Sequence, residues 1–188
     1  MNVRWIKCIG VAALFLLTID RASAQQQFHQ LTVNDFGGAP RTNARGVIAY
    51  TNCTIDFRYQ ANRSNGSYII NAFVRLILNT EKSWLDRSRI SSPQVLAEVL
   101  KHEQGHYTIA YLEQQEVLRE IGRARFSRNY QYEAMSLFNR IDAKYKQLNI
   151  DYDEDTQHMT DRIQQHSWDV YFQKQLRVMP GVQGEGTD

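Results

Sequence analysis

The stretch that decides the fold is SSPQVLAEVLKHEQGHY, residues 91–107. It opens with a helix start signal, because Ser92 can accept hydrogen bonds from the first free N–H groups and Pro93 suits the first helical position. Apolar residues then recur at steps of three or four, beginning with Val95 and Val99. That is the period of a helix with one buried face. The pattern predicts a long helix that runs into the 120s.

Inside this helix lies the pattern His-Glu-x-x-His, formed by His102, Glu103 and His106. Histidines four residues apart lie on one face of a helix, where both imidazoles can bind the same zinc ion. Glu103 follows the first histidine, so its carboxylate can take a proton from zinc-bound water and later deliver it to a leaving amine. The motif therefore predicts a Zn²⁺ site with two histidine ligands and a glutamate as general base.

A third ligand has to come from another segment, since a catalytic zinc usually has three protein ligands and one open position. The longer His-Glu-x-x-His-x-x-Gly-x-x-His pattern is absent, because Ile109 and Leu112 stand at its glycine and its last histidine. The residues leave several candidates open, namely His158, His166 and helical carboxylates such as Glu113, Glu116, Glu120 and Glu133.

Gly105 lies in the middle of the motif. Glycine inside a helix costs about 1 kcal/mol relative to alanine, so it needs a reason. We expect the close approach of a strand or of a substrate to be that reason.

Strands precede this helix. Alternating apolar residues within 46–59 and β-forming residues over 68–78 predict two strands, joined by the turn-rich segment 61–67 into a hairpin. The second strand is apolar on both faces, so we expect it to be covered on both sides. Cys53 is expected to be a buried strand residue without catalytic function.

Helices follow the motif. A second helix is expected from near Ser127 to Leu148, then a polar break over 149–154, then a third helix from 155 or 156 towards Gln175. Trp84 and Trp168 are expected in the core, as large aromatic residues usually are.

The two ends of the chain are expected to lie outside the folded domain. Arg4 and Lys7 precede an apolar run, and the small residues of 22–24 suit a signal-peptidase site, so residues 1–24 resemble a cleaved secretory signal. The predicted cut after Ala24 places the protein in the periplasm or outside the cell, without stable membrane insertion. Residues 25–180 are expected to form a single domain and 181–188 a disordered tail.

Composition limits the classes of partner. Among 188 residues, 22 are Lys or Arg and 20 are Asp or Glu, so there is no electrostatic footprint for nucleic acid. The hydrophobic share of 43% excludes a mainly disordered chain.

The chain resembles the exported bacterial proteins grouped as domain of unknown function 922, which are regarded as zinc-dependent proteases because of their motif. Besides the metal motif, the matching residues are Leu31-Thr32, Asp35-Phe36, Ser83-Trp84, Tyr152-Asp153, Thr156, His158, Gln165 and Trp168. The resemblance implies His102, His106 and His158 as ligands and Glu103 as general base. Two positions depart from it: Met159 stands in place of a glycine and Thr108 in place of an acidic residue.

Two neighbours in the C-terminal block are further candidates. Tyr152 could donate a hydrogen bond to the oxyanion of a tetrahedral intermediate, or it could be a packing residue. Asp153 could orient an imidazole or cap the third helix.

We therefore expect an α+β, zincin-like domain, with a small antiparallel sheet packed on the active helix and two further helices. The expected function is exported zinc-dependent hydrolysis of peptide bonds, with a peptide or protein substrate pairing with the edge of the strand Phe73–Asn79. Two alternatives are a non-catalytic, zinc-stabilised module that binds an envelope partner, and a hydrolase of a peptidoglycan amide.

Overall fold

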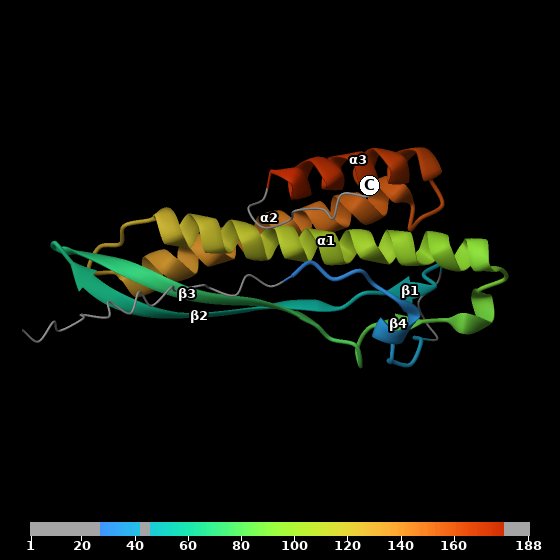
Figure 1. Ribbon diagram of the computed structural model, residues 1–188, viewed down its shortest axis with the longest axis horizontal. Helices are drawn as coiled ribbons and strands as arrows, with labels where there is room; N and C mark the ends of the chain where they lie inside the picture. Colours follow the sequence, from blue (N-terminus) through green and yellow to red (C-terminus); the bar gives the residue numbers. More distant parts are fainter. Residues whose placement is uncertain (1–26, 42–45, 179–188) are drawn as a thin grey trace, which may run out of the picture.

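The computed structural model describes residues 27–41 and 46–178, and Figure 1 shows three long helices lying over a β-hairpin. The helices are α1 (Pro93–Arg123), α2 (Tyr130–Thr156) and α3 (Arg162–Arg177). The strands are β1 (Ala49–Tyr50), β2 (Cys53–Ser64), β3 (Ser67–Leu78) and β4 (Trp84–Leu85). The described residues also contain two short 3-10 helices, Val33–Asp35 and Arg87–Arg89. The α+β class is confirmed, while the expected signal peptide and tail lie outside the described residues.

The hairpin is long and narrow. β2 and β3 pair antiparallel from Cys53 opposite Leu78 to Ser64 opposite Ser67. Asn65 and Gly66 close it with φ angles of 47° and 82°, the left-handed conformation that an Asn-Gly hairpin turn adopts. The expected hairpin is therefore confirmed, but its turn is shorter than the expected segment 61–67, because residues 61–64 belong to β2 and pair with β3.

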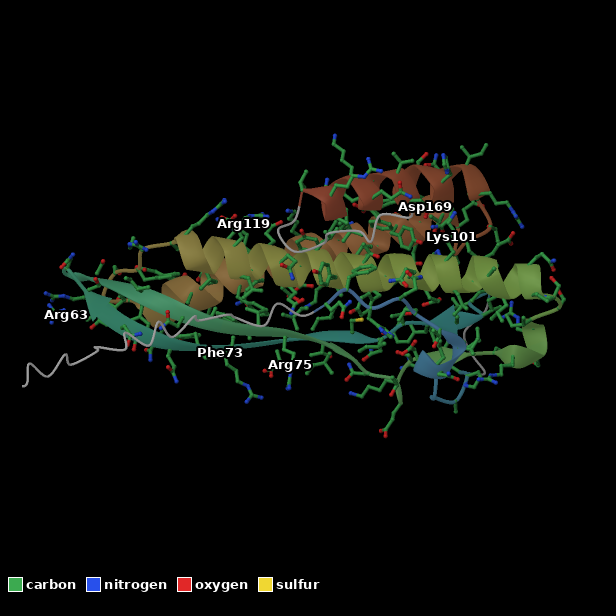
Figure 2. The ribbon with its side chains drawn as sticks, viewed as in Figure 1. Arg63, Phe73, Arg75, Lys101, Arg119 and Asp169 are labelled. Carbon is green, nitrogen blue, oxygen red and sulfur yellow. The ribbon has the colours of Figure 1, made fainter. Side chains whose placement is uncertain are left out.

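Among the described residues, the α-helices cover one face of the hairpin. On the covered face the ring of Phe57 stacks on Phe138 of α2, with centroids 5.0 Å apart. On the other face Phe73 is 61% exposed, and Figure 2 shows Phe73 and Arg75 pointing away from the helices. The expectation that β3 is covered on both sides is wrong, because within the described residues α1, α2 and α3 lie on the same side of the hairpin.

The chain changes strand partner just before β2. β1 pairs antiparallel with β4, and after Thr51 and Asn52 the same extended chain pairs with β3 instead. The fully buried Ser83 stabilises this change of strand partner. Its hydroxyl accepts a hydrogen bond from the backbone amide of Asn52 and donates one to the backbone carbonyl of Asn79. This arrangement places Thr51 beside Glu103 of α1.

α1 is the central element, with core on both sides. One cluster packs α1 on the hairpin, α2 and α3, and it includes the almost fully buried Leu112, Val117 and Ile121. A second cluster packs Tyr107 and Tyr111 of α1 against the N-terminal segment and the β1–β4 pair. Burial of each such side chain stabilises the fold by about 1.5–3 kcal/mol. The position of α1 is therefore fixed from two directions.

α2 and α3 do not begin and end where the sequence suggested. The expected break at 149–154 is helical, and α2 ends at Thr156. α3 begins at Arg162, where the side chain of Asp161 caps it by accepting from two backbone amides. The polar residues of 149–154 stay in the helix because several of their side chains have partners at the site described below.

No helix in the described part of the chain has the length and apolar character needed to cross a membrane.

Candidate metal centre

Two helices bring three ligand groups to one point. His102 and His106 come from α1 and Asp153 from α2, and this is the one group with metal-ligand geometry that residues 27–41 and 46–178 contain. The two Nε2 atoms are 3.2 Å apart, and each is 3.2 Å from Oδ1 of Asp153. Ligand atoms on a tetrahedral zinc, at bond lengths near 2.0–2.1 Å, lie about 3.3 Å apart. The triangle thus has the dimensions of a zinc site.

Each imidazole is held by its other ring nitrogen. Nδ1 of His102 lies 3.2 Å from Oε1 of Gln165, and Nδ1 of His106 lies 2.8 Å from Oδ1 of Asn149. An amide oxygen can only accept, so each Nδ1 donates, and each Nε2 is the ring atom that turns toward the other ligands and can bind a metal once it has lost its proton. Such outer partners orient metal ligands and fix their tautomer.

The charges of the group also suit a cation. Although burial alone would lower the pKa of His106, the hydrogen bond to Asp153 and the nearby carboxylates raise it to about 9. Burial would raise the pKa of Asp153, but its contacts with His102 and His106 hold it well below its usual range. A half-buried carboxylate between two imidazoles attracts positive charge, and two histidines with a carboxylate are ordinary zinc ligands. The donor set therefore fits Zn²⁺.

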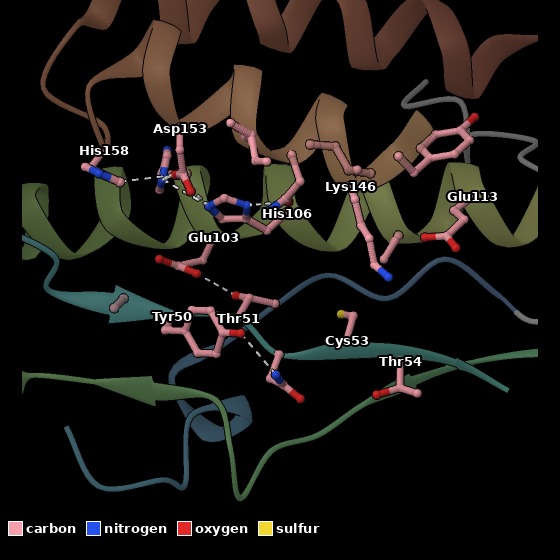
Figure 3. A pocket seen from close by; sticks show the side chains of 18 of the residues that line it. Tyr50, Thr51, Cys53, Thr54, Glu103, His106, Glu113, Lys146, Asp153 and His158 are labelled. Atoms are coloured by element: carbon pink, nitrogen blue, oxygen red, sulfur yellow. Dashed lines mark hydrogen bonds and ion pairs between the residues drawn. The ribbon is translucent and has the colours of Figure 1, made fainter. Parts of the chain in front are cut away.

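Glu103 lies beside the ligands and is held from the strand side. It is buried, and its Oε2 accepts a hydrogen bond of 2.6 Å from the hydroxyl of Thr51. Figure 3 shows this contact between Thr51 and Glu103 of α1, below His106. One carboxylate oxygen is thus fixed from the strand side, and Glu103 is not one of the three converging groups.

His158 lies at the edge of the group. Its Nδ1 is 3.3 Å from Oδ1 of Asp153, but its side chain is 52% exposed and it does not join the three converging ligands. It is not inside the start of α3, as expected, but in the turn after α2, where Gln157, His158 and Met159 all have positive φ. Met159, at φ 78°, occupies a conformation that favours glycine, which accounts for the glycine expected there.

Tyr152 is a packing residue in this structure. It is fully buried, it does not line the groove, and its hydroxyl donates to the carbonyl oxygen of His102 at 3.0 Å. This placement does not bring the phenol to a position where it could contact a substrate oxyanion. Its ring stacks on the imidazole of His102, with centroids 4.8 Å apart.

The same tyrosine explains Gly105. A Cβ atom at this position would lie 2.3 Å from the hydroxyl oxygen of Tyr152 and 2.4 Å from its Cζ. The reason for the glycine is therefore the side chain of α2, and not a strand or a substrate as expected. Close approach of the two helices at this point is what lets Asp153 reach the histidines of α1.

A groove of about 820 Å³ runs from these ligands along α1. Its walls are the backbone and side chains of 47–55 on one side, and α1 and α2 on the other. The expected substrate edge, Phe73–Asn79, is not part of its wall. The extended segment that faces the site is 47–55, which contains β1 and the first residues of β2.

The remaining third-ligand candidates lie elsewhere. Glu116 accepts from Lys144 and Tyr145, Glu120 pairs with Arg119, and Glu133 accepts from Ser127 at the start of α2. His166 is exposed on α3. Glu113 lines the groove but does not join the ligand group.

Sequence reasoning missed Thr51, Asn149 and Gln165, and it gave Asp153 only a supporting role. Asp153 does contact the imidazoles, but Asp161 is the cap of α3. A signal was present, since positions 149, 152, 153 and 156 share one helical face. It was hidden because so many polar residues in succession are typical of a loop.

Cys53 is the first residue of β2 and is half-buried. Burial and the nearby Glu113 and Glu103 raise the pKa of its thiol to about 12. The thiol therefore stays protonated at neutral pH, which agrees with the expectation that it is no nucleophile. Trp84 is buried as expected, and Trp168 packs edge-on against Tyr152.

Comparison with known proteins gives a family and no activity. The model of the family described as "Bacterial protein of unknown function (DUF922)" matches residues 18–159, so this chain belongs to that family. The match takes in α1 and α2 with the three converging ligands, and it ends one residue after His158. No curated protein and no solved structure matches the chain.

Proposed function

Since this chain is a member of the DUF922 family and its two main helices converge on a possible metal site, we propose that it is a zinc-dependent peptidase. The observation that carries the proposal is the triangle of His102, His106 and Asp153 with the carboxylate of Glu103 beside it. A purely structural zinc site is usually closed by four protein ligands, whereas three ligands next to a base are typical of hydrolytic sites.

We propose Zn²⁺ as the metal and Asp153 as its third ligand. Its Oδ1 completes the triangle, while His158 touches Asp153 from the more exposed side. His158 remains the alternative that the family resemblance implies. When bound, zinc would polarise a carbonyl group and lower the pKa of a coordinated water to about 7.

In this proposal Glu103 is the general base and then the general acid. Thr51 holds one of its oxygens, so the other is available to take a proton from the attacking water and to deliver it to the departing amine. Asn149 and Gln165 are positioning residues that keep both imidazoles aimed at the metal. Tyr152 supports the backbone of His102 and does not contact the substrate.

A peptide suits the groove better than a compact substrate. Nine consecutive residues, 47–55, form one wall, so an extended chain could lie along their backbone and pass Glu103. Export through the predicted signal peptide would place this activity in the periplasm or outside the cell, and N-terminal sequencing that finds Gln25 first would test that part.

The decisive experiment compares wild type with Glu103→Gln. Metal analysis should find about one zinc per chain in both proteins, because Glu103 is not a ligand. Cleavage of a broad peptide library, read by mass spectrometry, should fall by about 10²–10⁴-fold in the variant, the usual contribution of a general base.

A matched control is Glu98→Gln, since Glu98 lies near the start of the same helix and pairs with Arg162 on the surface. It should retain both zinc and activity. If wild type binds zinc but neither it nor the two variants cleave any peptide, the zinc-stabilised binding module would be favoured. Absence of zinc from wild type would overturn the proposal.

A further inference from the structure

The groove has a second polar end, about two turns of α1 beyond the histidines. Glu113 lies there, on the same face of α1 as His102 and His106, and Figure 3 shows it at the opposite end of the groove from His158. With a rise of 1.5 Å per residue, the seven steps from His106 to Glu113 span about 10 Å. That is about the length of three residues of extended peptide.

Glu113 is buried and incompletely bonded. The residue is only 8% exposed, and the Oε1 atom of its carboxylate makes no hydrogen bond. An unpaired buried polar atom is costly, so native structures rarely keep one without a function or a ligand. Here the atom belongs to a carboxylate in the wall of the groove that also holds the metal ligands.

The neighbours of Glu113 leave a negative charge unbalanced. Asp142 and Lys146 of α2 line the same end of the groove and bind each other, with Nζ 2.8 Å from Oδ2. Tyr145 of α2 and Cys53 of β2 complete the ionisable groups on that wall, and burial raises the pKa of both, so both stay neutral near pH 7. One cation therefore faces two carboxylates.

We propose that Glu113 forms a recognition subsite for a positively charged group of the substrate, placed about three residues from the bond that is cut. An ammonium or guanidinium group would supply the hydrogen bonds that Oε1 lacks and balance the charge. The chemistry fits a lysine or arginine side chain and also a free amino terminus. The proposal rests on the proposed peptidase function only for the position of the scissile bond.

The ionisation of Glu113 agrees with this assignment. Burial and the charge of Asp142 raise its pKa to about 7, against the opposing effect of Lys146. Capture of a cation would favour the charged form, so the preference for a cationic ligand should increase between about pH 6 and pH 8.

The test uses peptide hydroxamates as probes, because a hydroxamate binds zinc without being cleaved. Lysine is placed at each position in turn in otherwise norleucine-containing probes, and affinity for the zinc-loaded full chain is measured by calorimetry. We expect a preference for lysine of about tenfold or more at one position, about three residues from the hydroxamate. Probes with a free and an acetylated amino terminus distinguish the two sources of charge.

The matched variants are Glu113→Gln and Glu120→Gln. Both lie on α1, but Glu120 pairs with Arg119 outside the groove. The preference for lysine should disappear in Glu113→Gln, while norleucine probes bind as before, and it should persist in Glu120→Gln. Equal affinity for lysine and norleucine in wild type would overturn the subsite and leave the metal site standing.

A second measurement does not depend on the metal. Butylammonium is titrated into the metal-free chain with ¹³C-labelled glutamate, and the carboxyl resonance of Glu113, assigned through Glu113→Gln, is followed by NMR. It should shift and saturate with butylammonium and not with butanol. An unmoved resonance would overturn the subsite. If no hydroxamate binds but this resonance shifts, the peptidase proposal fails and the cation site holds.

Discussion

The two ends of the groove are built from the same face of α1, yet they differ in how their polar atoms are satisfied. At the metal end, both imidazoles and Asp153 contact one another, and each imidazole is also anchored by an amide oxygen. At the other end, Oε1 of Glu113 is buried without a partner. A site whose groups are already ordered before the ligand arrives can bind a small ion. A buried carboxylate oxygen without a hydrogen bond instead indicates that the ligand itself donates the missing hydrogen bond.

The difference comes from α2. Near the metal, α2 presents Asn149 and Asp153, whose oxygens accept from the histidines or face them. Near Glu113 it presents Asp142 and Lys146, which pair with each other. The same helix thus completes one end of the groove and leaves the other end incomplete.

The largest expected effect is the loss of metal on removing Asp153. In Asp153→Ala, zinc affinity should fall by more than about 100-fold, beyond what outer partners contribute, because a ligand atom is lost. In His158→Ala the loss should be smaller, since that side chain contacts only Asp153 at the exposed edge. Competition with a zinc chelator measures both affinities.

Circular dichroism of the metal-free proteins serves as control, because both variants should remain folded. If His158→Ala loses zinc while Asp153→Ala keeps it, the third ligand is the histidine that the family resemblance implies, and the geometric assignment is wrong.

The next effect concerns the anchors of the imidazoles. Asn149→Ala and Gln165→Ala each remove the acceptor that orients one ring, so each should weaken zinc binding by about 10–100-fold. Gln147→Ala is the matched control, because Gln147 bonds Asp151 on the exposed side of α2. Unchanged zinc affinity in both anchor variants would mean that packing alone orients the rings.

Sequence reasoning worked where a residue has one dominant local role. Ser92 and Pro93 start α1 as expected, and the Asn65-Gly66 turn closes the hairpin. The spacing of His102 and His106 placed both rings together because helical geometry alone decides it. These features depend on neighbours within about one turn of chain.

It failed where a distant partner overrides local preference. The stretch 149–154 looks like a break, but Asn149 and Asp153 remain helical because the histidines of α1 supply their partners. The reason for Gly105 lies 47 residues away, in the ring of Tyr152. No periodicity reports such contacts, since they exist only once α1 and α2 have packed together.

A smaller effect is expected from filling the space at Gly105. In Gly105→Ala the new Cβ would overlap the ring of Tyr152, and forcing an extra methyl into a packed core costs about 1–3 kcal/mol. Denaturant unfolding measures this loss. Gly122→Ala on the same helix is the control, because nothing lies within 4 Å of its Cβ, and it should gain about 0.5–1 kcal/mol.

A double-mutant cycle sharpens this test. Tyr152→Ala removes the ring, so adding Gly105→Ala to it should cost nothing further. Additive losses in the double variant would show that Gly105 is needed for another reason.

The smallest expected effect is at Glu113, and it depends on pH. Folding raises the pKa of this carboxyl from 4.5 to about 7, chiefly by burial, so the ionised form destabilises the folded chain. This penalty is absent below pH 4.5, grows between the two pKa values and is complete above pH 7. Glu113→Gln should therefore match wild type near pH 4.5 and be more stable at higher pH. Because the groove admits solvent that screens the charge, we expect the free energy of unfolding of Glu113→Gln to exceed that of wild type by an amount on the order of 1 kcal/mol, or about 2–4 °C in Tm. Glu120→Gln is the matched control, because that side chain pairs with Arg119 and does not line the groove. A Glu113→Gln protein that is no more stable than wild type at high pH would mean that the carboxylate already has a partner in solution, and the contrast between the two ends of the groove would not hold.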